Sequence, residues 1–244
     1  MIKNYMNNKV NRVLLTSYNA NNEKDDQFYV EQQFSPSSRA LKTITRSGIT
    51  NQSVLISYAD ANGNVIKTID SSEIVVTITD YQYNDKGQLV SLITSSSDTS
   101  SNKESEQHIW EWNNNHPVKM LRIKNKFDTA YVEFIIDEKG NVAEERETRK
   151  KIRLQPIYYY YNENNQLSDI VRYSPRAKQL MAEYIFEYSD ANQVIQKITI
   201  PSNNSNYLFW RYQYDARGLK VKEKIFDKQK QLTGTIEYLY SFGS

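Results

Sequence analysis

The chain of 244 residues repeats one short pattern, in which alternating apolar and polar residues end at an aromatic or apolar anchor and a polar turn follows. In the clearest copy, residues 74–93, the alternation ends at Tyr81-Gln82-Tyr83. The turn Asn84-Asp85-Lys86-Gly87 comes next, and a second strand opens at Leu89. Self-similarity at a fixed period indicates a repeat architecture, so we expect an array of similar hairpins.

The anchors recur at regular intervals along the chain. They are Phe34, Tyr58, Tyr83, Trp112, Ile136, Tyr161, Tyr188, Tyr214 and Tyr240. Successive anchors are 24, 25, 29, 24, 25, 27, 26 and 26 residues apart. The repeat therefore measures 24–29 residues and covers residues 34–244.

Period-two alternation places each anchor and the residues two and four before it on one face of a strand. Those residues are Val54/Ile56/Tyr58, Trp110/Trp112, Val132/Phe134/Ile136, Ile157/Tyr159/Tyr161, Tyr184/Phe186/Tyr188, Trp210/Tyr212/Tyr214 and Ile236/Tyr238/Tyr240. Because Val, Ile and Phe occupy the same positions as Tyr and Trp, we interpret this face as the buried core of the array. The residues between them are mostly polar, as in antiparallel strands with one wetted face.

The fourth residue after most anchors tolerates positive φ. These residues are Gly87, Gly140, Asn165, Asn192 and Gly218, with Gly63 one place later in a longer version. A type I turn followed by a left-handed residue closes a short hairpin, and Gly or Asn suits that geometry. Each repeat is therefore predicted to be one hairpin.

The predicted fold is all-β: about nine antiparallel hairpins in a curved meander sheet, a partly closed shell or a two-layer sheet. We expect one domain over residues 1–244, with residues 1–33 as a degenerate N-terminal cap and residues 34–244 as the repeats. The polar segments 95–106 and 201–206 read as loops, because the repeat resumes after each. Unpaired sheet edges would allow self-association.

Two segments, Tyr81-Gln82-Tyr83-Asn84-Asp85-Lys86-Gly87-Gln88-Leu89 and Tyr212-Gln213-Tyr214-Asp215-Ala216-Arg217-Gly218, resemble the YD repeat of Rhs-type and teneurin-like proteins. Looser matches such as Phe186 to Asn192 extend the resemblance over about residues 30–244. It implies a secreted or surface-attached bacterial protein with an extended, shell-like β-sheet. The chain shows neither the self-cleaving core segment nor a toxin domain after Tyr240, so it resembles a small stand-alone surface protein or lipoprotein of this kind.

Composition excludes several classes of function. Cysteine is absent, which removes disulfides, thiolate nucleophiles and thiolate metal ligands. The net charge of +2 gives no overall attraction to nucleic acid or anionic lipid. No apolar run is long enough for a membrane-spanning helix, and no signal peptide is visible, so an extracytoplasmic location is implied by the resemblance alone.

The sequence offers few residues for a metal site. His108 and His116 flank an aromatic strand, but Glu111 alternates onto the face opposite Trp110 and Trp112, so we expect strand and turn roles and no metal. The segment 60–64 superficially resembles a calcium loop but lacks its spaced oxygen ligands, and is predicted to be a hairpin turn. No cofactor is expected.

Charged residues give no clear site either. Glu144, Glu145 and Glu147, or Glu104 and Glu106, could in number form a catalytic carboxylate pair, but nothing in the sequence desolvates them. Two basic clusters read as a solvated face with no nucleic-acid role. They comprise Arg146, Arg149, Lys150, Lys151 and Arg153, and Lys119, Arg122, Lys124 and Lys126.

The remaining candidates are Trp110, Trp112 and Trp210, which would stack on sugar rings if the sheet exposes them. We therefore expect a non-catalytic, secreted or surface-associated repeat protein that presents a sheet face to a glycan or a protein. The alternatives are a glycan-active enzyme with carboxylates on a concave face, and a structural shell or scaffold component.

Overall fold

A computed structural model describes residues 1–48, 51–72, 75–97, 104–201 and 207–243, so the loops predicted at 95–106 and 201–206 lie partly outside the described residues. Helix α1 spans Ile2–Asn7. The strands are β1 (Val10–Asn19), β2 (Phe28–Ser35), β3 (Ala40–Ser47), β4 (Asn51–Ala59), β5 (Val65–Ser72), β6 (Val75–Tyr83), β7 (Leu89–Ser97), β8 (Ser105–Asn113), β9 (His116–Lys124), β10 (Asp128–Ile136), β11 (Val142–Arg149), β12 (Ile152–Arg153), β13 (Ile157–Tyr161), β14 (Leu167–Ser174), β15 (Gln179–Tyr188), β16 (Val194–Thr199), β17 (Leu208–Tyr214), β18 (Lys220–Phe226) and β19 (Leu232–Phe242).

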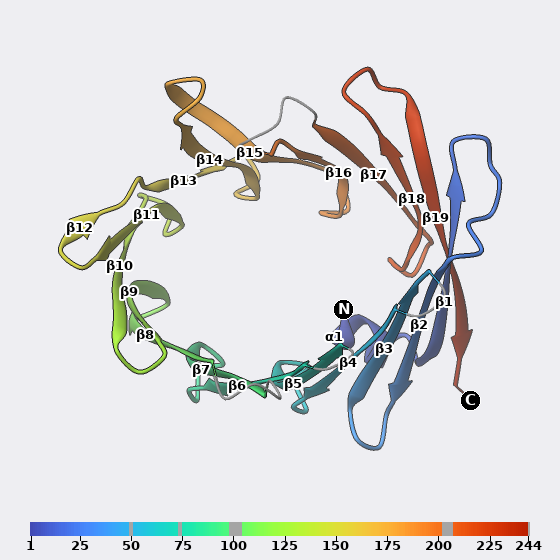
Figure 1. Ribbon diagram of the computed structural model, residues 1–244, viewed down its shortest axis with the longest axis horizontal. Coiled ribbons are helices and arrows are strands. Elements are labelled where there is room, and N and C mark those ends of the chain that lie inside the picture. The colour runs from blue at the N-terminus through green and yellow to red at the C-terminus, as the bar shows by residue number, and fades with distance from the viewer. Residues whose placement is uncertain (49–50, 73–74, 98–103, 202–206, 244) are drawn as a thin grey trace.

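The described strands form one antiparallel sheet that closes on itself (Figure 1). Strand β1 pairs with β2 along one edge and with β19 along the other. The two-residue β12 pairs with β11, which itself continues to β13, so the other eighteen of the nineteen strands make a closed barrel. The all-β antiparallel prediction is confirmed, but the partly closed meander sheet is corrected to a barrel.

Closure comes from residues 1–33, which we expected to form a cap and which contain α1, β1 and the start of β2. Every described strand of the ring has a partner on both sides, so the ring offers no free edge for the self-association that we expected.

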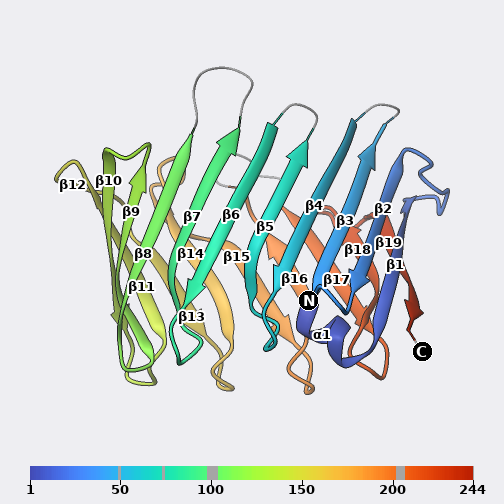
Figure 2. The ribbon, with the colours of Figure 1, turned by 90° about the horizontal axis from the view of Figure 1, so that it is seen from below.

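The barrel has two different ends (Figure 2). Short turns follow β2, β4, β6, β8, β10, β13, β15 and β17 at one end, which we call the turn rim. The longer connections lie at the other end, which we call the loop rim. Helix α1 lies at the turn rim, inside the ring (Figures 1 and 2).

Most turns of the turn rim share one hydrogen-bonding pattern. Directly after the anchor, an Asp or Asn side chain accepts N–H groups from the residues two and four places on, as Asp137 Oδ1 does from Lys139 and Asn141 at 2.9 and 2.7 Å. Asp60, Asn84, Asn162 and Asp215 repeat it. The predicted left-handed positions are confirmed, with φ of 60–89° at Gly63, Gly87, Gly140, Asn165, Asn192 and Gly218. The segment 60–64 is therefore a hairpin turn in which Asp60 serves the backbone.

The register corrects one anchor. Phe34 pairs with Leu41, and Leu41 pairs with Ser57, so Ser57 and Ala59 share the face of Phe34 while Tyr58 lies on the opposite face. Ala59 is therefore the true anchor, and Val54, Ile56 and Tyr58 point outward. With Ala59 as the anchor, the positive-φ residue Gly63 is in the fourth position, as in the other turns.

The anchor face is the inner face of the barrel, because α1 lies inside the ring and packs against it. The buried cluster around α1 comprises Ile2, Tyr5, Val10, Val13, Phe34, Leu41, Ala59 and Leu219. Away from α1 the inner aromatic residues are only half-buried, and Leu55 and Leu208 on the same face are each 37% exposed. The prediction of a buried core along the whole anchor face therefore holds in two sectors only: the one beside α1, and a smaller one on β9 and β10, where Met120, Ala130 and Val132 are buried.

Helix α1 connects strands from both sides of the β19–β1 seam. Tyr5 donates its hydroxyl to Gln32 Oε1 on β2 at 2.6 Å, and its ring meets the ring of Tyr240 on β19 edge to face at 6.2 Å. Asn4 Nδ2 donates to the carbonyl of Gly218, in the turn between β17 and β18, at 3.2 Å. Six helical residues are too few to be stable alone, so packing inside the barrel must hold them.

We predict that Tyr5→Ala lowers the free energy of unfolding by about 3–5 kcal/mol, as expected for removing a buried aromatic side chain. Urea unfolding followed by circular dichroism would measure it. The exposed neighbour Asn7 is the matched control, and Asn7→Ala should change stability by less than about 0.5 kcal/mol. Equal effects of the two substitutions would mean that α1 does not stabilise the seam.

The left-handed backbone conformation of the turns can be tested at Gly87. A Cβ added there would meet no atom within 4 Å, so only the backbone conformation opposes a side chain. We expect Gly87→Ala to cost about 1–2 kcal/mol of unfolding free energy. Gly87→Asn should cost less, because Asn165 and Asn192 already hold this position with φ of 62° and 60°. Lys86→Ala, in the same turn, should be nearly neutral; a loss as large as that of Gly87→Ala would contradict the explanation.

Candidate functional site

The inner face of the barrel carries a ladder of aromatic residues in two tiers, and each tier has a different role. The first tier contains the anchors, and the second contains the residues two places before them. The second tier lies one step further from the turn rim. Residues directly opposite in an antiparallel pair share a face, so the register traces both tiers from strand to strand.

The first tier locks neighbouring hairpins together. The side chain of an aromatic anchor donates a hydrogen bond to the backbone carbonyl that opens the return strand of the preceding hairpin, at 2.7–2.9 Å. The donors are Tyr83, Trp112, Tyr161, Tyr188, Tyr214 and Tyr240, and the acceptors are Val65, Leu89, Val142, Leu167, Val194 and Lys220 in the same order. These anchors are therefore structural residues.

The second tier is more open. Tyr159 donates to Glu145 at 2.9 Å and Tyr238 donates to Glu223 at 2.5 Å. Tyr81, Trp110 and Tyr212 face the interior half-buried, and their polar atoms have no hydrogen bond to the described residues. A ligand inside the barrel would meet these side chains.

The three tryptophans that the sequence singles out all face the interior, at two separate places. Trp110 and Trp112 lie on β8, and Trp210 lies on β17, across the ring in Figure 1. Trp110 contacts His108 edge to face at 5.5 Å, and the ammonium of Lys197 lies 5.4 Å from the ring centre of Trp210. Trp110 and Trp210 each expose part of a ring beside a polar group, whereas Trp112 uses its N–H as an anchor.

The inner face has two contrasting walls. Strands β13–β18, along the upper side of Figure 1, form a wall rich in aromatic residues, which we call the aromatic wall. Strands β3–β7, along the lower side, form a wall rich in hydroxyl groups. Its inward Ser and Thr residues include Thr43, Thr45, Ser53, Ser57, Thr68, Thr77, Thr79, Thr94 and Ser96, and Leu55, Asp70 and Tyr81 lie among them. The hydroxyls of Thr79 and Thr94 lie 2.9 Å apart and hydrogen-bond each other. The interior therefore combines stacking surfaces on one side with small hydrogen-bonding groups on the other.

The inward charges of β8–β15 are mostly neutralised in ion pairs. Arg122 pairs with Glu147, Arg149 pairs with Asp128, and His108 Nε2 lies 2.5 Å from Glu106. Arg149 and its neighbours hold the pKa of Asp128 below its usual value. The first basic cluster is thus divided: Arg146 pairs with Glu144 on the outer face at 2.7 Å, while Lys150, Lys151 and Arg153 are exposed at the loop rim.

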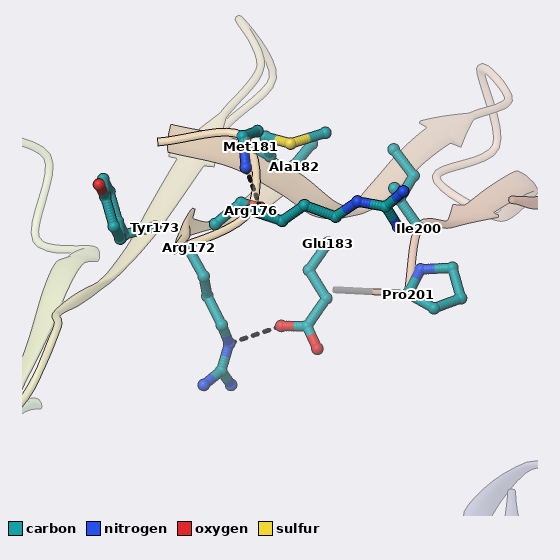
Figure 3. A pocket seen from close by; sticks show the side chains of 10 residues that line it. Arg172, Tyr173, Arg176, Met181, Ala182, Glu183, Ile200 and Pro201 are labelled. Atoms are coloured by element: carbon teal, nitrogen blue, oxygen red, sulfur yellow. Dashed lines mark hydrogen bonds and ion pairs between the residues drawn. The ribbon is translucent and has the colours of Figure 1, made fainter. Parts of the chain in front are cut away.

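A pocket of about 350 Å³ opens where β14, β15 and the end of β16 meet at the loop rim (Figure 3). Arg172 and Glu183 point toward each other in Figure 3, with Nε and Oε2 at 2.5 Å. Met181, Ile200 and Pro201 supply an apolar wall. The Arg172–Glu183 ion pair leaves no unpaired carboxylate here for acid–base chemistry.

The other carboxylates of the sequence analysis are not gathered into one site. Glu144 lies on the outer face, and Arg146 lowers its pKa, which opposes a role as a general acid. Glu145 and Glu147 face inward, bound to Tyr159 and Arg122. Glu111 lies opposite Lys119 on the outer face, away from His108. Among the described residues, no three His, Asp or Glu side chains come together as a metal site.

His116 opens β9 directly after a tight turn, and its ring packs against Gly140. The preceding turn is closed by Asn114, at φ 53°, so His116 is a strand residue and the turn role is corrected. A Cβ at Gly140 would lie 2.6 Å from the imidazole.

No protein-family model and no curated protein matches the chain. Among solved structures, it is similar to a chain of the Photorhabdus luminescens Tc holotoxin pore, with 12% identity and a TM-score of 0.40 over 91% of this chain. The chain corresponds to only 13% of the length of that toxin chain. It is also similar to a porin-like protein from Bacteroides uniformis, with 13% identity, a TM-score of 0.39, and coverage of 96% of this chain and 97% of that one. Within the described residues, no helix is long and apolar enough to cross a bilayer.

The tyrosine ladder predicts a loss of stability at alkaline pH. Burial raises the pKa of the inner tyrosines Tyr83, Tyr159, Tyr161, Tyr188, Tyr212, Tyr214, Tyr238 and Tyr240. It raises the pKa of Tyr5 on α1 to about 12. In the unfolded chain these groups ionise near pH ~10, so above that pH the unfolded state is favoured. Stability should therefore be constant from neutral pH to about pH 9 and then fall as pH rises.

Urea midpoints between about pH 8 and about pH 11.5 would test this, together with the tyrosinate absorbance of the folded protein. Tyr212→Phe removes one ionising group without removing a hydrogen bond recorded for the described residues, so its stability should fall less steeply above pH ~10. Tyrosines that all titrate near pH ~10 in the folded barrel would contradict the burial of the ladder.

Proposed function

We propose that this chain is a non-catalytic, extracytoplasmic YD-repeat barrel whose interior binds a carbohydrate chain. The observation that carries the proposal is the pairing of two inner walls. On β17, the half-buried rings of Trp210 and Tyr212, without hydrogen-bond partners among the described residues, lie across the interior from a wall of Ser and Thr hydroxyls. Sugar rings offer apolar faces for stacking and hydroxyls for hydrogen bonding, so both walls match one ligand.

The YD-repeat assignment is supported by features shared between repeats. The segments that resemble the YD consensus, 81–89 and 212–218, share three of them: an anchor tyrosine bonded to the preceding hairpin, a capping Asp or Asn, and a positive-φ glycine. The same plan recurs at Tyr161, where Asn takes the place of Gly. The resemblance therefore concerns residues that create the hairpin.

A polypeptide is the weaker candidate for the ligand. An extended peptide gains most of its affinity by adding a strand to a free sheet edge, and the described ring strands have none. An enzymatic role is also less well supported. The inward carboxylates Glu145, Glu147 and Glu223 are bound to Tyr159, Arg122 and Lys220, and the inward Asp70 on β5 has no second carboxylate beside it on β4 or β6.

The test is a glycan array followed by calorimetry on the best ligand, with Trp110→Ala and Trp210→Ala beside the wild type. Each substitution removes an inward ring, and we expect affinity to fall by about thirtyfold, as for an aromatic contact at the centre of an interface. Trp112→Ala is avoided because Trp112 is an anchor. Tyr131→Ala is the control, since Tyr131 is 63% exposed on the outer face.

Absence of any glycan ligand would overturn the proposal, and so would an equal loss in Tyr131→Ala. A variant that still folds by circular dichroism and keeps full affinity would show that its ring does not contact the ligand. Release of a new reducing end from a bound glycan would instead assign the interior to an enzyme.

A further inference from the structure

Three neighbouring connections of the loop rim concentrate positive charge. They are residues 124–128 between β9 and β10, 149–157 from the end of β11 through β12, and 174–181 between β14 and β15. We call them the basic sector. They contain eight Lys and Arg against one acidic residue, Asp128, a balance of 8 − 1 = +7. The whole chain carries +2, so the rest carries 2 − 7 = −5.

The cations of the basic sector are available to a partner. Arg149 is paired with Asp128. The other seven are Lys124, Lys126, Lys150, Lys151, Arg153, Arg176 and Lys178. All seven are exposed, and none of them forms an ion pair with a described residue. Seven like charges held close together repel one another, so an anionic partner would stabilise them.

The same three connections carry large apolar side chains at their tips. Phe127 is 82% exposed and Ile152 is 65% exposed. Leu154, Leu180 and Met181 are also exposed. Each lies within three residues of a cation of the sector. Strand β12, which carries Ile152, projects from the barrel at the end opposite α1 (Figure 2). An isolated exposed apolar residue needs no explanation, but this cluster beside seven cations does.

The turn rim carries no such excess of cations. Six of its eight turns, residues 60–64, 84–88, 137–141, 162–166, 189–193 and 215–219, contain seven acidic and three basic residues, a balance of 3 − 7 = −4. Arg39 in the β2–β3 turn, with Lys3 and Lys9 beside α1, brings this to −4 + 3 = −1. An anionic surface would therefore attract the basic sector much more strongly than the turn rim, which favours one orientation.

We propose that the basic sector docks the barrel on an anionic lipid surface. Lys and Arg would bind headgroup phosphates, while Phe127, Ile152 and their apolar neighbours enter the interfacial layer. A combination of cations and apolar tips suits a bilayer interface, which offers negative charge above hydrocarbon. A nucleic acid or an acidic protein surface would use the cations but would leave Phe127 in water. This proposal is independent of the carbohydrate proposal, because it involves the rim and not the interior.

The experiment is vesicle co-sedimentation of the full chain. The vesicles contain phosphatidylcholine alone or equal parts of phosphatidylcholine and phosphatidylglycerol. We expect binding to the mixed vesicles that weakens as salt rises, and little binding to phosphatidylcholine alone. Lys150→Gln/Lys151→Gln should weaken binding by roughly thirtyfold, since each cation near the surface contributes about fivefold. Phe127→Ser/Ile152→Ser should weaken it by at least about tenfold without altering its salt dependence.

Two matched variants serve as controls. Lys86→Gln/Lys139→Gln removes two exposed cations from the turn rim, and Tyr131→Ser/Leu239→Ser removes two exposed apolar residues, 63% and 69% exposed, from the outer wall. Both should bind as the wild type does. Equal losses in test and control variants, or no binding at low salt, would overturn the proposal. Binding to heparin that exceeds binding to vesicles and ignores Phe127 would also overturn it, and would assign the sector to an acidic macromolecule.

Discussion

Every strand at the edge of a sheet exposes unpaired N–H and C=O groups, and in this chain β1 resolves that problem by pairing with β2 on one side and β19 on the other. The remaining architecture follows from this closure. A closed sheet has an inside, so one face of every strand must line a shared interior. The anchor face takes that side because α1 precedes β1 and brings Ile2 and Tyr5 against Val13 and Phe34. The apolar sector around α1 thus lies inside the closed sheet.

Because the sheet is closed, the residues of the aromatic ladder are not all buried core. In an open sheet covered by a second layer, Tyr and Trp at the anchor positions would simply be core. In the barrel only the sector beside α1 and a smaller one around Val132 are buried, and the aromatic rings elsewhere stay half-buried. The aromatic anchors compensate for this incomplete burial by donating a hydrogen bond to the preceding hairpin, as Tyr214 does to the carbonyl of Val194. The tier above them has no such task, which leaves Trp110 and Tyr212 for a ligand.

The features that could be predicted from the sequence are local ones. Gly87 and Asn165 mark their turns because only a few residue types accept positive φ, and alternation places Tyr159 and Tyr161 on one face without any knowledge of the fold. The Tyr58 anchor was wrong because the last aromatic residue before this turn faces outward, and the inward position is held by the small residue Ala59. Counting back four residues from Gly63 identifies Ala59. Closure of the sheet could not be predicted from local patterns, because the pairing of Val13 with Tyr240 depends on the total curvature of all strands. The two-tier division of the ladder was also hidden, because it depends on which hydroxyls reach a neighbouring carbonyl.

The uneven distribution of charge explains why the net charge was a poor guide. The net charge of +2, from which no attraction to an anionic partner was expected, is the sum of a rim sector at +7 and a remainder at −5. Over the Debye length of about 8 Å at physiological salt, a partner at the loop rim is affected by the sector and not by the sum. The capping Asp residues of the turns, such as Asp137 and Asp215, accept hydrogen bonds that the hairpin requires, and Asp227 does the same at the loop rim. No such role accounts for the Lys and Arg residues beside Phe127 and Ile152, which makes this excess the part of the charge pattern that the fold does not require.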